Sequence, residues 1–187
     1  MTDSGAQTLR DWRFFMIRDG LLLVLACAAV WGMVWTGSSA PVPSIAAGGL
    51  VGLAAYLLHE WAHLLGALAV RARVYRPARG WSPFLFSFDS GANSLRQFLA
   101  MSLPGFAATA LYVWAFVEWL PRATLWGETA WRVGLALSLL TLVVEVPIAV
   151  WAVWRRRVPA VEIPLVGPHP LVDRLLGGLR VRQRSER

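Results

Sequence analysis

Three residues near the middle of the chain have the types and the spacing of a zinc hydrolase site. Residues 59–63 read H-E-W-A-H, and on a helix His59 and His63 lie one turn apart on the same face. Two neutral imidazoles on one face can hold zinc and leave other coordination positions open. Glu60 is rotated from that face by about 100°, so we expect it to act on water as a general base. A third protein ligand must then come from elsewhere in the chain.

The competing interpretation is that this match is accidental, or that the two histidines are buried and merely hydrogen-bonded. The motif fixes only three positions, and chance matches occur in soluble helices. Here, however, the three ionisable residues stand inside an apolar run from Val42 to Val70. Such groups cost about 2.5–3.5 kcal/mol each in a membrane helix and usually face a functional interior. The setting therefore favours a metal site.

The composition indicates a membrane protein. The chain has 187 residues, of which 57% are hydrophobic, and it contains 11 tryptophans. The net charge is +7 and every basic residue is arginine. In a soluble protein that excess would suggest nucleic acid as a partner. Because the arginines cluster at the ends of apolar segments, orientation in a bilayer is the better explanation, and no nucleic acid is expected. The single cysteine, Cys27, excludes an intrachain disulfide.

The apolar segments predict an all-α integral membrane protein with four transmembrane helices. The expected helices cover residues 20–37, 42–70, 97–120 and 133–154. A cleaved signal peptide is the alternative for the first, since small residues occupy positions 38–40. Pro41 follows at once, and the apolar run is longer than a usual signal-peptide core. A retained helix is therefore favoured.

The placement of arginine predicts the domain organisation and the orientation. A cytoplasmic N-terminal tail (1–19) and a basic cytoplasmic C-terminal tail (158–187) flank a four-helix transmembrane domain (20–157) that contains the H-E-W-A-H motif. Both tails and the connection at 71–96 are rich in arginine, whereas the other two connections hold few. Both termini are thus expected in the cytoplasm, with the helices in a bacterial cytoplasmic membrane.

The connection between the second and third helices contains a possible strand. Residues 83–88 read P-F-L-F-S-F, which would place Phe84, Phe86 and Phe88 on one side of an extended segment. A short membrane-associated β-loop would let these residues bind substrate. An aromatic loop at the membrane interface is an equally good interpretation, because a short apolar run is ambiguous by periodicity.

Depth in the membrane selects the third ligand. His63 lies eight residues before Arg71, or about 12 Å, and Glu145 lies ten residues before Arg155, or about 15 Å. Both helices end on the same side, so Glu145 is expected to meet the two histidines and complete the site. A protonated Glu145 hydrogen-bonded between helices is the alternative role for this residue.

Two residues of the C-terminal tail are rivals for the same position. Asp173 follows the stop sequence on the cytoplasmic side and would have to fold back into the bundle, and His169 is a weaker rival for the same reason. Both are better explained as surface residues.

The chain resembles the site-2 protease family of intramembrane zinc metalloproteases over about residues 45–155. Besides H-E-W-A-H, residues 103–106 read L-P-G-F early in the next helix, like that family's Gly-Pro region, and a later helix carries an acidic residue. The resemblance implies that His59 and His63 are ligands and Glu60 is the base. It also implies that the segment 84–88 is the family's β-loop. We add Pro104 and Gly105 as candidate substrate-binding residues.

Two departures leave the third ligand open within this resemblance. The family usually has an asparagine a few residues after its Gly-Pro pair, and here Thr109 lies nearest. Its third ligand is commonly an aspartate before glycine. Here Glu145 precedes Val-Pro, and Asp173 lacks a following glycine.

The sequence thus predicts a metalloendopeptidase with one Zn²⁺ per chain that cuts transmembrane protein substrates within the lipid bilayer. A metal-carrying membrane protein is the alternative, and it would use the histidines without needing Glu60 as a base. A structural four-helix subunit that binds no zinc is a third possibility. No oligomeric state is indicated.

Overall fold

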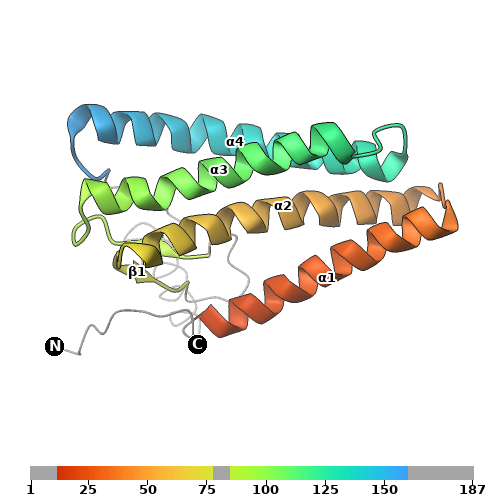
Figure 1. Ribbon diagram of the computed structural model, residues 1–187, viewed down its shortest axis with the longest axis horizontal. Helices are drawn as coiled ribbons and strands as arrows, with labels where there is room; N and C mark the ends of the chain where they lie inside the picture. The colour runs from red at the N-terminus through yellow and green to blue at the C-terminus, as the bar shows by residue number, and fades with distance from the viewer. Residues whose placement is uncertain (1–11, 78–84, 160–187) are drawn as a thin grey trace, which may run out of the picture.

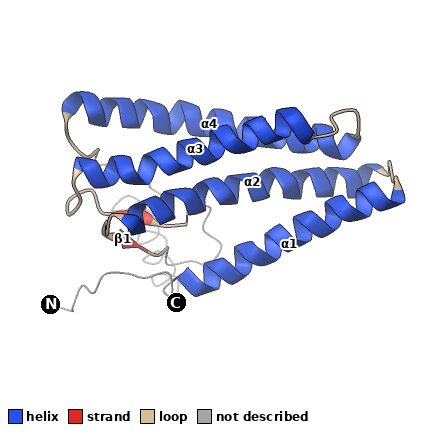
Figure 2. Cartoon of the chain, viewed as in Figure 1, coloured by secondary structure: helices blue, strands red, loops and turns tan. Residues whose placement is uncertain are grey.

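The described part of the chain is a four-helix arrangement with a small sheet at one end (Figures 1 and 2). This computed structural model describes residues 12–77 and 85–159. The helices are α1 (Arg13–Thr36), α2 (Pro41–Ala69), α3 (Leu95–Trp119) and α4 (Leu125–Arg155). Strands β1 (Val74–Tyr75) and β2 (Ser87–Phe88) pair antiparallel between α2 and α3. All four helices are long and apolar enough to cross a membrane, which confirms the predicted helical class and the presence of strands.

Helix α1 begins seven residues before its predicted start at residue 20. The polar residues 12–19 looked like a tail, but Phe15 and Asp19 are buried. The Asp19 carboxylate accepts hydrogen bonds from Arg18 at 2.6 Å and from the Trp61 indole of α2 at 2.8 Å. Because its charge is paired, the buried aspartate is tolerated and the helix extends into the polar segment. The predicted tail 1–19 is thus partly helical, and residues 1–11 and 160–187 lie outside the described residues.

Helix α4 begins eight residues before its predicted start at residue 133. Thr124 caps it, since its hydroxyl accepts from the Gly127 amide at 3.1 Å. Glu128 in the first turn interacts favourably with the positive end of the helix dipole and pairs with Arg132 at 2.8 Å. These polar residues were predicted to form a loop, but they form a regular helix start.

Helix α2 lies at the centre and contacts α1, α3 and α4. Its packing face carries small residues beside the two histidines, and all of these are buried: Gly48, Gly52, Ala55, His59, His63 and Gly66. A Cβ atom at Gly48 or Gly52 would overlap α4, and one at Gly66 would overlap the Ala100 carbonyl of α3. Glycine therefore lets α4 approach α2 closely at Gly48 and Gly52, and lets α3 approach it closely at Gly66, three residues after His63.

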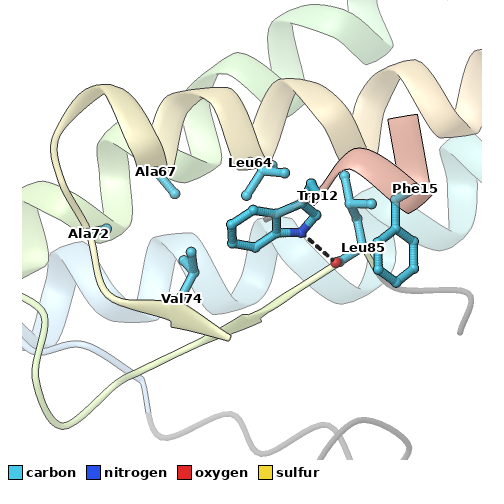
Figure 3. Packing of buried hydrophobic residues seen from close by; sticks show 7 residues of the cluster. All are labelled: Trp12, Phe15, Leu64, Ala67, Ala72, Val74 and Leu85. Atoms are coloured by element: carbon cyan, nitrogen blue, oxygen red, sulfur yellow. Dashed lines mark hydrogen bonds between the residues drawn. The ribbon is translucent and has the colours of Figure 1, made fainter. Parts of the chain in front are cut away.

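A hydrophobic cluster ties the sheet to the bundle (Figure 3). It consists of Trp12, Phe15, Leu64, Ala67, Ala72, Val74 and Leu85. The Trp12 indole N–H donates to the Leu85 carbonyl at 3.2 Å, across the interior of the cluster. Leu85 is 3% exposed, so the segment entering β2 is fixed against α1 and α2.

Polar contacts close the loop beside the sheet. The side-chain amide of Asn93 accepts from the Arg73 backbone N–H and donates to its carbonyl, both at 2.7 Å. The Tyr75 hydroxyl donates to Asp89 at 2.8 Å. This hydrogen bond lowers the pKa of Asp89 below its ordinary value. The loop thus has its own electrostatic support outside the membrane-spanning helices.

Candidate metal centre

The two histidines of the motif point into the bundle from α2. Their Nε2 atoms are 3.0 Å apart, and the two rings meet edge to face with centroids separated by 4.4 Å. His59 is 1% exposed and His63 is 7% exposed. One helical turn between them therefore gives the convergence that the spacing predicted.

Glu145 reaches the same point from α4. Its Oε1 lies 3.3 Å from Nε2 of His59, and its Oε2 lies 3.0 Å from Nε2 of His63. The carboxylate thus spans both imidazoles, and the ligand atoms of the three residues lie within 4.8 Å of one another. The prediction that Glu145 meets the histidine pair is confirmed. Its rivals Asp173 and His169 lie outside the described residues.

Helix α3 holds the opposite nitrogens of the two rings. Nδ1 of His59 lies 3.0 Å from the Gly105 carbonyl and 2.8 Å from the Thr109 hydroxyl oxygen. Nδ1 of His63 lies 2.9 Å from the Met101 carbonyl. A carbonyl only accepts, so each Nδ1 must carry the hydrogen. In the neutral imidazoles both Nε2 atoms are consequently unprotonated and present lone pairs to the centre.

Nε2 of His59, Nε2 of His63 and the Glu145 carboxylate are then three hydrogen-bond acceptors that face one another, with no donor among them. A proton on one imidazole would satisfy one of these contacts, whereas a cation at the centre satisfies all three. Ligands held about 2.0–2.2 Å from a tetrahedral ion lie about 3.3–3.6 Å apart, close to the observed 3.0–3.3 Å. Two imidazoles and a carboxylate are also a donor set that zinc accepts. The three residues therefore suit a metal ion.

Glu60 is next to this group but outside it. The residue is 7% exposed, and its Oε2 accepts from the Leu85 backbone N–H at 3.1 Å. Both histidines are close enough to act on it electrostatically. The predicted rotation away from the ligand face is thus observed, and the loop before β2 helps to hold the carboxylate.

Tyr56 is a second neighbour of the site that sequence reasoning missed. Its side chain is hydrogen-bonded to Glu60, and its ring stacks on His59 with centroids 6.1 Å apart and planes at 23°. The spacing offered a signal, because Tyr56 precedes Glu60 by four residues and therefore lies on the same face of the helix. Thr109 was noted only as a departure from the family pattern, yet it contacts a ligand.

Pro104 and Gly105 lie behind the histidines. A Cβ atom at Gly105 would overlap the His63 ring, so only glycine lets α3 come this close. The Pro104 ring packs against Gly66 of α2, next to the Ala100 carbonyl that this proline deprives of its helical donor. The two residues thus allow α3 to pack closely against the face of α2 that carries the histidines. Contact with substrate stays a prediction for both.

The predicted aromatic strand is shorter than expected. Of the described residues 85–88, Ser87 and Phe88 form β2, and Phe84 lies outside the described residues. Phe86 and Phe88 are half-buried and pack against the hydrophobic cluster, and Phe88 also meets Phe98 edge to face at 5.9 Å. Packing therefore accounts for the buried part of each of these two rings. Their role in substrate binding stays a prediction.

Comparison with protein-family models, with curated proteins and with solved structures finds no match for this chain. The resemblance to site-2 proteases consequently depends on the sequence motifs alone. What the chain does has to be inferred from the geometry of the site.

Proposed function

We propose that this chain is an intramembrane zinc metalloprotease that hydrolyses peptide bonds of transmembrane protein substrates. One observation carries the proposal: His59, His63 and Glu145 converge as ligands, while Glu60 stands beside them as an additional carboxylate. A site built only to hold a metal has no need of a second acidic group at this depth, where each such group is costly. A hydrolase needs it as a base.

The protein groups divide the reaction between them. Zinc, when bound, supplies a Lewis acid that polarises the scissile carbonyl and makes water acidic. Glu60 accepts the proton of the attacking water as the water oxygen bonds to the carbonyl carbon. It then passes that proton to the leaving nitrogen as the carbon–nitrogen bond breaks. The Leu85 N–H donates to Oε2 of Glu60 and helps to fix the carboxylate.

Access to the site supports a membrane-embedded substrate. Glu145 has a side chain that is 31% exposed, so the ligand group opens towards one side of the bundle. A substrate helix must unwind before its peptide bonds can reach this point, because they are otherwise hydrogen-bonded within the helix. Pairing with the short sheet would hold it extended, with the arginine-rich end and both termini in the cytoplasm of a bacterium.

Glu60→Gln tests the proposal, with Glu128→Gln as the matched control on an exposed residue of α4. Both variants are purified in detergent and reconstituted with labelled single-span substrates. We expect about one zinc per chain in each, because neither residue is a ligand. Cleavage should fall about 100- to 10,000-fold in Glu60→Gln alone, since the amide cannot accept the proton.

The outcome also distinguishes a metal carrier. Undiminished activity of Glu60→Gln would remove the base from the mechanism, and zinc transport that survives the change would establish the carrier instead. Absence of zinc from the wild-type protein would contradict both functions.

A further inference from the structure

We propose that the Tyr56 hydroxyl stabilises the oxyanion that forms on the scissile carbonyl, which makes Tyr56 a further catalytic residue. This inference rests on the proposed peptidase function. It adds an electrophilic group from the protein to the metal ligands and the base. Tyr56 lies one turn before the motif on α2, and nothing in the H-E-x-x-H pattern assigns it a role.

Tyr56 contacts both the proposed base, Glu60, and one of the proposed zinc ligands, His59. Its hydroxyl is hydrogen-bonded to Glu60. Its ring stacks on that of His59 with the planes at 23°, and this stacking restrains the side chain. Tyr56 is half-buried and thus lies beside both the proposed base and one of the two histidines.

The chemistry of the neighbours favours Tyr56 as the donor. Glu60 and Glu145 are acceptors when ionised, and the Thr109 hydroxyl lies at Nδ1 of His59, at 2.8 Å, opposite to the Nε2 atom that faces the centre. A neutral phenol contributes one O–H donor, which in the resting site points to the Glu60 carboxylate.

During the reaction the stronger acceptor for the phenol O–H changes from the Glu60 carboxylate to the carbonyl oxygen of the substrate. As the water oxygen bonds to the carbonyl carbon, the π electrons move to the carbonyl oxygen and the water proton moves to Glu60. The base becomes neutral at the moment when the oxyanion becomes negative. The phenol O–H can therefore turn to the oxyanion and keep its own proton throughout. This hydrogen bond exists in the transition state and not in the substrate complex, so it acts on kcat.

Tyr56→Phe removes the hydroxyl and keeps the ring on His59. Tyr112→Phe is the matched control, because it also removes a tyrosine hydrogen bond between side chains, to Ser138 of α4 at 2.7 Å, away from the ligands. Loss of one oxyanion donor costs about 100- to 1,000-fold in kcat. We expect that loss for Tyr56→Phe with KM and zinc content unchanged, and less than a threefold change for Tyr112→Phe.

A binding measurement separates this role from a structural one. A phosphinic peptide, in which a tetrahedral phosphorus group replaces the scissile amide of the cleaved substrate, presents an oxygen where the oxyanion would be. Calorimetry should show that Tyr56→Phe binds it at least tenfold more weakly than wild type, while affinity for the unreactive parent peptide is unchanged. Equal losses for both peptides would overturn the inference. Incorporation of 3,5-difluorotyrosine at position 56 retains the hydroxyl and should retain cleavage within tenfold.

The failure of this inference is distinguishable from failure of the proposed function. Wild-type protein that cleaves substrate, with kcat and phosphinic-peptide affinity unaltered in Tyr56→Phe, overturns the role of Tyr56 alone. Zinc-loaded wild-type protein that cleaves no single-span substrate overturns the proposed function and this inference with it.

Discussion

Replacing Glu145 by glutamine should weaken metal binding without removing the helix that carries it. The amide retains the size of the side chain, but it loses the negative charge that spans the two imidazoles at 3.0 and 3.3 Å. Complete four-ligand zinc sites bind with about 10–16 kcal/mol, or about 2.5–4 kcal/mol per ligand. Since about 1.4 kcal/mol is a factor of ten, losing one ligand should raise the Kd about 100-fold or more.

Thermal unfolding with added zinc measures this change directly. At a free zinc concentration about 100 times the wild-type Kd, binding stabilises the wild-type protein by about 2.7 kcal/mol. A 100-fold weaker variant would gain about 0.4 kcal/mol at the same concentration. Titrating purified wild type and Glu145→Gln in detergent, and comparing the apo forms first, separates metal binding from any effect of the substitution on folding.

Two further variants serve as the negative and positive controls for the zinc titration of Glu145→Gln. Glu128→Gln lies on the same helix in an exposed pair with Arg132, and it should respond to zinc as wild type does. His59→Ala should lose the response together with the bound metal. If Glu145→Gln keeps the full stabilisation while His59→Ala loses it, Glu145 is not a ligand. Asp173→Asn, tested in parallel, would then be expected to lose zinc.

Two further predictions concern the surroundings of the site. Gly105→Ala should weaken zinc binding at least tenfold in the same titration, because the added methyl group displaces the His63 ring, whereas Gly49→Ala, which meets nothing within 4 Å, should not. The pKa of Asp89 is lowered by the Tyr75 hydroxyl, so this contact stabilises the loop above the ordinary carboxyl pKa and is lost as pH falls through the lower folded value. Limited proteolysis should therefore cut Tyr75→Phe faster than wild type at pH 7, and the difference should shrink as the pH falls below the ordinary carboxyl pKa; a constant difference would contradict this assignment.

Long-range features of this fold were predictable from one-dimensional patterns. Apolar runs set the number of helices, and counting residues from arginine boundaries placed Glu145 at the level of His63, because a straight helix converts sequence separation into depth. The start of α4 was missed for a local reason. Thr124 and Glu128 are good helix starters, but polarity beside an apolar run was interpreted as the end of the membrane segment.

The partners of the histidine rings could not be predicted from residue types. His59 and His63 are oriented by the carbonyls of Gly105 and Met101, and every residue has a carbonyl. Which ones face a ligand depends on how α3 rotates against α2, and that rotation is set by close packing at Gly66. Sequence patterns reveal that a glycine occurs there, but the contact it permits is visible only in three dimensions.

Glu60 and the hydrophobic cluster are connected through a single residue, Leu85, which gives the segment entering β2 a role beyond packing. Leu85 donates its N–H to Glu60 and accepts from the Trp12 indole with its carbonyl. Glu60 is nearly inaccessible, and a buried carboxylate needs donors to remain ionised and oriented. The segment entering β2 supplies one of them from outside the four helices. The loop between α2 and α3 is therefore part of the site, because displacing it would leave the proposed base without a donor that holds it in place.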